Sequence, residues 1–154
     1  MRVLFIGRFQ PFHFGHLSVL QEIDSRNDIE EIIIGIGSAQ YSGTGENPYT
    51  FERRKVMIEK SVCGELKNKY RIVAIPDVHN NDLWVDYVAS IVGKFDEVYT
   101  GNDLVKRLFS AKQYQVKSVK IYQGIMATKI RDLMRQDSED WEKMVPTAVA
   151  RLLG

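Results

Sequence analysis

Short apolar runs alternate along this chain with stretches in which apolar residues recur at helical spacing. The runs are rich in Val, Ile and Tyr, are each short enough for a strand, and lie at residues 3–6, 31–36, 70–75, 97–99 and 116–122. Helical spacing is found at residues 16–25, 50–62, 83–92, 103–111 and 128–135, and in a C-terminal pair around Trp141 and Ala148. Nearly all-apolar strands that alternate with helices predict an α/β fold, a Rossmann-like three-layer sandwich around a mostly parallel sheet of five to six strands.

The turn-rich segments of the chain follow the predicted strands. The densest one is 38–48, where Gly43, Gly45 and Pro48 lie close together. Ligands of open α/β sheets bind beyond the carboxyl ends of the strands. We therefore expect the loops at 7–16, 38–48, 76–82 and 101–103 to open on one common edge.

Length and composition narrow the class of protein. The 154 residues, 44% of them hydrophobic, carry no linker, repeat or low-complexity run, which predicts a single domain over residues 1–154. The 21 basic and 20 acidic side chains give a net charge of +1, so no general attraction to nucleic acid is expected. An anionic ligand must therefore be bound by a local group of residues and not by the overall charge of the protein.

Cysteine content and the first residues bear on location. Cys63 is the only cysteine, which excludes an intrachain disulfide and a four-cysteine zinc site; we expect its side chain to be buried. The first apolar run is broken by Arg8 and is too short for a signal peptide or a membrane span. These features predict a soluble, cytoplasmic protein without a membrane partner.

The segment from Gly7 to His16 directly follows the first predicted strand and reads Gly-Arg-Phe-Gln-Pro-Phe-His-Phe-Gly-His. Gly7 permits a tight turn, Arg8 offers a planar fork of donors for phosphate oxygens, and the next helix presents free backbone amides. Two histidines three residues apart can converge on one phosphoryl group, and Gly15 between them allows close approach. Two alternatives remain open: a surface turn with two solvated imidazoles, or a metal pair for which only His79 stands out as a third ligand.

This segment resembles the His-x-Gly-His signature of the nucleotidyltransferase superfamily, and the longer run is similar to archaeal-type nicotinamide mononucleotide (NMN) adenylyltransferases. Four further segments agree with that family, at residues 37–40, 47–53, 81–85 and 99–102. The resemblance implies transfer of AMP from ATP to NMN, giving NAD and pyrophosphate, with Mg²⁺ accompanying ATP as the co-substrate. It also implies a homo-oligomer. We name no protein ligand for a metal.

The resemblance assigns roles to residues that match the family. Transfer chemistry at phosphorus needs mainly positioning and charge neutralisation, for which the implied catalytic residues are His13, His16, Arg8 and Arg131. The residues implied to bind ATP are Gly7, Phe9, Gln10, Gly15, Gly101, Asn102 and Thr128. The residues implied to bind the mononucleotide are Asp77, Val78, Asn81 and Trp84; for Trp84, stacking on a pyridinium ring competes with a role as ordinary core.

Two positions depart from the family pattern. Met126 replaces the serine of the closing Ser-x-Thr-x-x-Arg signature, in which Thr128 and Arg131 match. The lost hydroxyl removes one phosphate hydrogen bond, worth about 1.5–3 kcal/mol, so we expect altered ATP affinity rather than lost activity. Glu46 lies where some relatives carry an arginine, which leaves the role of the 38–48 loop open.

Other readings stay open from the residues alone. A related transferase could act on phosphopantetheine, a flavin mononucleotide or a choline-like phosphate, although the Trp84 segment argues against this. A nucleotide-binding regulator that lost turnover is a different class of answer. We expect His79 and Lys106 to be simply exposed, Arg107 to be either exposed or in reach of a phosphate, and Pro146 to be a first helical residue.

Overall fold

A five-stranded sheet forms the centre of the protein, in a computed structural model that describes all 154 residues. The strand order is β3-β2-β1-β4-β5 and every pairing is parallel. The strands are β1 (Arg2–Gly7), β2 (Glu31–Gly37), β3 (Tyr70–Ile75), β4 (Glu97–Thr100) and β5 (Gln115–Ser118). This confirms the predicted Rossmann-like α/β fold. Because the chain runs outward from β1 to β3 and then returns to β4, the direction reverses between β1 and β4, where such sheets bind ligands.

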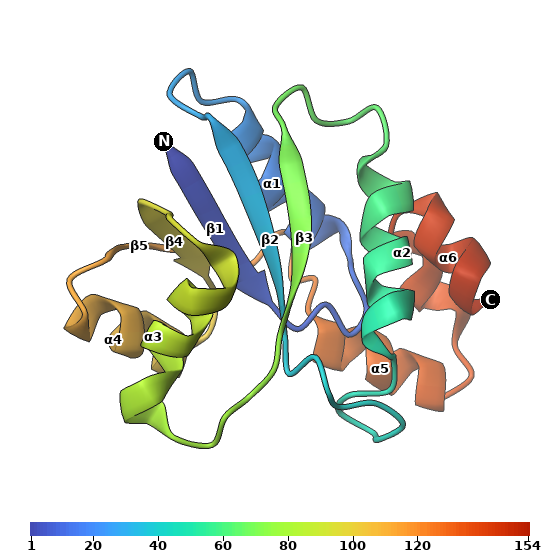
Figure 1. The fold of residues 1–154 in the computed structure, drawn as a ribbon. Coiled ribbons are helices and arrows are strands. Elements are labelled where there is room, and N and C mark those ends of the chain that lie inside the picture. The colour runs from blue at the N-terminus through green and yellow to red at the C-terminus, as the bar shows by residue number, and fades with distance from the viewer.

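Helices cover both faces of the sheet (Figure 1). Their bounds are α1 (Phe14–Asp24), α2 (Phe51–Val62), α3 (Asn81–Val92), α4 (Asp103–Ala111), α5 (Ala127–Arg135), a 3₁₀ helix at Glu139–Met144 and α6 (Thr147–Leu153). One hydrophobic cluster joins α1, α2, α5 and the C-terminal segment to one face of the sheet. A second cluster joins α3 and α4 to the other face. The three layers therefore follow directly from the alternation of strands and helices.

Side chains of β1 show how one strand serves both faces. Val3 and Phe5 belong to the larger cluster, whereas Leu4 and Ile6 belong to the smaller one, as expected when successive side chains point to opposite faces. All four are almost fully buried. A strand with two buried faces must be apolar throughout, which explains its uninterrupted hydrophobic sequence.

The structure differs from the predicted elements in the last third of the chain. The final strand ends at Ser118, not at 122, and the predicted helix around Trp141 is a 3₁₀ helix. Pro146 lies at the N-cap of α6, one position before the first helical residue, where its missing N–H costs nothing.

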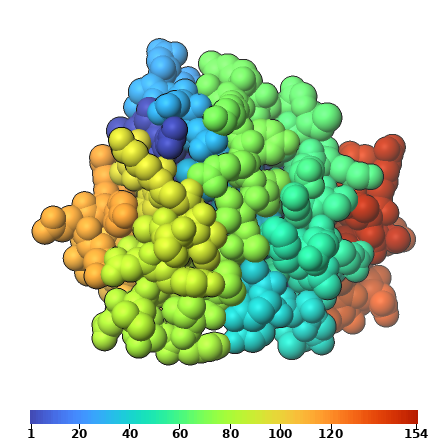
Figure 2. All heavy atoms as spheres, in the orientation of Figure 1, coloured from blue at the N-terminus to red at the C-terminus, as the bar shows by residue number.

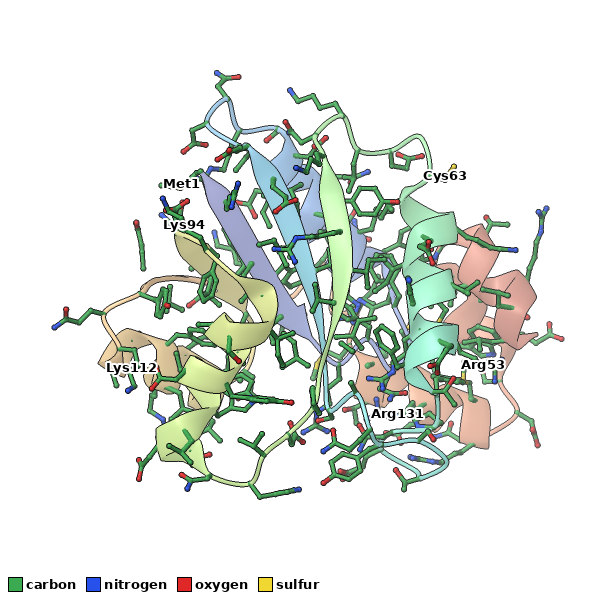
Figure 3. All side chains as sticks on the ribbon, in the orientation of Figure 1. Met1, Arg53, Cys63, Lys94, Lys112 and Arg131 are labelled. Atoms are coloured by element: carbon green, nitrogen blue, oxygen red, sulfur yellow. The ribbon has the colours of Figure 1, made fainter.

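Cys63 is exposed at the C-cap of α2, so the prediction that its side chain is buried is wrong. It lies at the opposite end of the sheet from Arg131 (Figure 3). The helix ends here because Gly64 adopts a left-handed conformation with φ of 77°. In the whole chain, no helix is both long and apolar enough to cross a membrane.

Candidate active site

Two hollows open at the carboxyl edge of the sheet. A cleft of about 570 Å³ lies over the first strand and α5, and a smaller hollow of about 290 Å³ is bounded by the loop that precedes α3, by α3 itself and by α4. We call them the phosphate cleft and the Trp84 hollow. Both are lined by the ends of β1 and β4, through Ile6, Gly7, Arg8, Thr100 and Asn102. The two hollows therefore adjoin at the point where the strand order reverses.

The two histidines of the phosphate cleft cap the start of α1. His13 is the N-cap residue, and its Nδ1 accepts from the amides of Gly15 at 3.0 Å and His16 at 3.4 Å. In return, the His13 amide donates to Nδ1 of His16 at 3.1 Å. The rings stack with centroids 3.6 Å apart. Since each Nδ1 accepts a hydrogen bond, each neutral imidazole carries its proton on Nε2.

Gly15 is required by this stacked pair. A Cβ at position 15 would lie 2.8 Å from Cε1 and 2.9 Å from Nδ1 of His13, closer than real carbon contacts allow. Any other residue would therefore displace the ring that caps the helix. This contact gives a physical reason for glycine within the His-x-Gly-His sequence.

Burial keeps both imidazoles neutral. Desolvation lowers the pKa of His13 to about 4. Desolvation, and then the proximity of His13, lower the pKa of His16 well below its ordinary value. The His16 ring lies among aromatic side chains, with centroids 4.7 Å from Phe9 and 5.5 Å from Phe12. The interpretation of the segment as a turn with two solvated imidazoles is therefore wrong.

Arg131 reaches the phosphate cleft from α5. Its Nη1 donates to the carbonyl of Gln10 at 2.8 Å and its Nη2 to Oγ1 of Thr128 at 3.4 Å, while its Nε is buried without a partner. Burial, followed by the nearby Arg135 and Arg8, lowers the pKa of Arg131, and Glu46 acts in the opposite direction. Glu46 is the only carboxylate that lines this cleft. The cleft thus presents an excess of positive charge.

Met126 is the N-cap of α5 and makes no side-chain hydrogen bond there. Its side chain is half exposed and lines the cleft with Ala127 and Thr128. The first amides of α5 consequently have no capping side chain. Such amides suit an anion, which the positive end of a helix also favours.

Arg54 supports the site from below and was missed by sequence reasoning. It is completely buried without an acidic partner, and its guanidinium donates to backbone carbonyls from three parts of the edge, those of Arg8, Gly37, Ser38, Ala39, Tyr41 and Thr50. Desolvation lowers its pKa to about 10. Arg54 therefore fixes the Arg8 backbone against the loop that follows β2. In the sequence Arg54 is one of several charged residues on an amphipathic helix, and nothing there marks it as buried.

The Trp84 hollow has a different lining. Trp84 belongs to the core, where its ring meets Phe109 edge to face at 5.5 Å, but it also lines the hollow, and its Nε1 is buried without a partner. Asp77 lies on the same wall and accepts a hydrogen bond from Ser38 Oγ at 2.9 Å. Core and site are thus compatible roles for Trp84. An indole N–H without a partner needs an acceptor that the chain itself does not supply.

The predicted site residues divide between the two hollows. The residues implied to act in catalysis or to bind ATP all line the phosphate cleft, and Asp77, Val78, Asn81 and Trp84 all line the Trp84 hollow. Arg107 is exposed and lines neither. His79, which the sequence suggested only as a third metal ligand or an exposed residue, lines the Trp84 hollow. Sequence reasoning missed several other lining residues, namely Ser38, Thr100, Lys120, Ile121, Tyr122 and Ile125. Their composition is that of ordinary strand or loop residues and carried no signal.

The fold and the phosphate cleft define a nucleotide-binding α/β protein of the nucleotidyltransferase class. The sequence model of the Cytidylyltransferase-like family matches residues 4–133. The chain is 46% identical over 154 residues to a nicotinamide-nucleotide adenylyltransferase of Thermoplasma volcanium, covering 99% of this chain and 85% of that one. It is 44% identical over 155 residues to the protein of the same name from Methanococcus aeolicus, covering 99% and 88%. The chain therefore belongs to the cytidylyltransferase-like family.

A solved structure supports the same family assignment. The bifunctional NMN adenylyltransferase/ADP ribose pyrophosphatase of Francisella tularensis, complexed with AMP and a manganese ion, superposes with a TM-score of 0.73 at 26% identity. The match covers 94% of this chain and 44% of that chain, so this chain spans less than half of the bifunctional protein.

Proposed function

We propose that this protein is a nicotinamide-nucleotide adenylyltransferase, which transfers AMP from ATP to NMN and releases pyrophosphate. The observation that carries the proposal is the meeting of the two hollows at Arg8. One hollow is basic and suits a triphosphate; the other is lined by the Trp84 indole and suits a pyridine nucleotide. An acceptor phosphate and an ATP bound in these hollows would face each other across the Arg8 side chain. The curated archaeal relatives carry the same activity in their names.

In the proposed reaction a phosphate oxygen of NMN attacks the α-phosphorus of ATP in line. The new P–O bond forms as the bond from the α-phosphorus to the bridging oxygen breaks, and pyrophosphate leaves with the bond's electrons. No covalent nucleophile is needed, since positioning and charge neutralisation supply most of the catalysis. Residues 1–154 act here as one nucleotidyltransferase domain.

The cleft residues take distinct parts in this step. His13 and His16 donate from Nε2 to oxygens whose charge grows in the transition state, and being neutral they do so with little reorganisation. Arg8 binds at the junction where the attacking phosphate meets the α-phosphate. Arg131, Thr128 and the amides of α5 hold the departing pyrophosphate.

Mg²⁺ enters the proposal as part of the co-substrate. No group of three or more His, Cys, Asp or Glu side chains lies together in this chain so as to hold a metal ion. Mg²⁺ commonly binds nucleotides through phosphate oxygens and water with few protein ligands. In the proposal Mg²⁺ therefore arrives with ATP, and no protein ligand is assigned to it.

A homo-oligomer is also part of the proposal. Several large apolar side chains are exposed outside the two hollows, among them Val56 and Leu83, and such groups are common in subunit contacts. Light scattering of the purified protein tests this, and a monomeric mass at micromolar concentration would contradict it.

The test of the activity is incubation with ATP, Mg²⁺ and single acceptors, with pyrophosphate and dinucleotide both measured. We expect NAD from NMN and one pyrophosphate per NAD. Pyrophosphate formed only with phosphopantetheine, flavin mononucleotide or a choline-like phosphate would keep the chemistry and overturn the substrate. Nucleotide binding without pyrophosphate from any acceptor would indicate a regulator instead.

A further inference from the structure

Two loops that follow β2 and β3 are bound to each other beside the Trp84 hollow. The Gln40 side chain donates to the carbonyl of Asp77 and accepts from its amide, both at 3.0 Å. Beyond this pair, the Tyr41 hydroxyl lies 2.6 Å from Nε2 of His79. Figure 2 shows the same contact as the segment near residue 40 lying against the segment near residue 80 at the lower end of the molecule. The wall of the hollow is therefore a fixed surface.

His79 is the titratable group of this wall that the proposed reaction does not use. Its backbone is left-handed, with φ of 56°, and the residue lines the Trp84 hollow. Nε2 is engaged by Tyr41, whereas Nδ1 makes no hydrogen bond within the chain. The expectation that His79 is simply exposed is therefore incomplete: it is exposed, yet held in place at the rim of a ligand-sized hollow.

The hydrogen bond between Tyr41 and His79 can run in either direction. A hydroxyl donates or accepts, and a neutral imidazole carries its proton on either nitrogen. When the hydroxyl donates to Nε2, Nδ1 carries the proton and is a donor; when Nε2–H donates to the hydroxyl, Nδ1 is an acceptor. Because of Tyr41, a neutral His79 can present either a hydrogen-bond donor or a hydrogen-bond acceptor to the hollow.

Two pyridine mononucleotides differ in this property. A carboxamide substituent on the ring both donates and accepts hydrogen bonds, whereas a carboxylate only accepts and bears a negative charge. Asp77 is the only carboxylate that lines the hollow, and it disfavours a second one nearby. An acid substrate consequently depends more on a donor at the rim than an amide substrate does.

We propose that His79, hydrogen-bonded to Tyr41, is a specificity-determining residue that contacts the ring substituent of the mononucleotide and allows a carboxylate as well as a carboxamide to bind. This inference rests on the proposed function. It concerns the choice between acceptors and leaves the transfer step to the phosphate cleft. Loss of a hydrogen bond to a charged group costs more than loss of a neutral one, so removal of His79 should penalise the acid acceptor selectively.

The test compares kcat/KM for NMN and for its nicotinate analogue in five proteins: the wild type, three test variants and one control variant. His79→Gly removes the ring at a left-handed position that glycine tolerates, and we expect the amide-to-acid ratio to rise about tenfold. His79→Gln restores a group that can donate and accept, and should return the ratio to within about threefold of wild type. Tyr41→Phe should change the ratio in the same direction as His79→Gly but less.

Tyr87→Phe is the matched control, because that tyrosine is half-buried on α3, makes no hydrogen bond through its hydroxyl and lies outside the hollow. An equal loss for both acceptors in His79→Gly would overturn the inference, because it would show that the His79 side chain does not distinguish the two ring substituents. Absence of dinucleotide from either acceptor with the wild-type protein would instead overturn the proposed function itself. The two failures are therefore distinguishable.

Discussion

Charged side chains lie at both ends of the parallel sheet. The buried carboxylates at one end are paired with basic side chains, whereas two arginines at the other end, Arg8 and Arg131, have no carboxylate partner. At the amino edge, Glu31 meets Arg71 at 3.2 Å and Lys69 at 3.5 Å, and Glu97 meets Arg26 at 2.7 Å. Both carboxylates are almost fully buried. The buried carboxylates at this edge are thus neutralised by basic side chains of the protein itself, as buried charges with a structural role must be.

The carboxyl edge has the opposite arrangement. Burial, and then the nearby Arg135 and Arg8, lower the pKa of Arg131, and the one carboxylate that lines the phosphate cleft is Glu46. Arg135 is paired with Asp132 at 2.6 Å, but Arg8 and Arg131 have no ion-pair partner comparable to the Glu97 partner of Arg26. The difference indicates that an external anion supplies the missing charge at the carboxyl edge. Substitutions at one edge should therefore affect catalysis, and substitutions at the other should affect stability.

Removing a donor from the carboxyl edge should have the largest effect. His16→Ala deletes an Nε2–H aimed at developing charge, and loss of one such donor in comparable sites costs about 2.7–4 kcal/mol. We expect turnover to fall at least about a hundredfold, measured as pyrophosphate release at saturating substrates. A circular dichroism spectrum and melting temperature near wild type would establish that the fold is intact. Turnover close to wild type would rule out this role for His16.

Breaking the amino edge should affect stability instead of catalysis. Arg26→Ala leaves the buried Glu97 carboxylate without its cation, and such a change typically costs about 3 kcal/mol or more. We expect a lower urea midpoint and an unchanged kcat at a temperature where the variant is folded. Lys112→Ala is the matched control, because its ion pair with Asp86 is exposed on both sides and should contribute at most about 1 kcal/mol. A loss of kcat in folded Arg26→Ala would show that the two edges are coupled.

Lowering the pH should reduce the stability of the folded protein, because the buried histidines at the carboxyl edge then become protonated. The pKa of His13 is about 4 in the folded protein and higher in the unfolded chain, so between these values the unfolded chain binds more protons. Stability is then full above pH 6.5 and declines as pH falls toward 4, by roughly 2–3 kcal/mol from this residue. Urea midpoints measured across that range should fall less in His13→Asn, in which asparagine still caps the helix but does not titrate. A midpoint independent of pH would contradict the buried neutral pair.

Much of the fold followed from periodicity alone. The strand at Tyr70–Ile75 and the helix at Asp103–Ala111 have the predicted bounds, because buried parallel strands and amphipathic helices leave strong patterns. The segment after Ser118 misled the prediction. Its Ile121 and Tyr122 resemble strand residues, but they are exposed beside the cleft, and the chain turns at Gln123 and Gly124 with positive φ. Apolar residues that face a ligand cannot be told by composition from those that face a core.

The site shows a similar division. The spacing of His13 and His16 predicted that they converge, and the structure stacks them. Their tautomers could not be predicted, since these depend on which backbone amides each Nδ1 meets. The six carbonyls around Arg54 come from residues up to 46 positions away from it, and these contacts follow no helix or strand periodicity. Contacts of this kind exist only once the three loops are brought together.

Restoring a hydroxyl at the start of α5 should have the smallest effect and would refine the comparison. In Met126→Ser the serine should cap α5, adding about 1 kcal/mol of stability, and should donate to a phosphate oxygen, lowering the KM for ATP about tenfold. Little packing is lost, because the Met126 side chain is 47% exposed. Met126→Ala is the matched control, since it removes the same thioether without adding a hydroxyl. If both variants lower the KM equally, the bulk of Met126 and not its missing hydroxyl limits ATP binding, and the uncapped amides of α5 already meet the phosphate unaided.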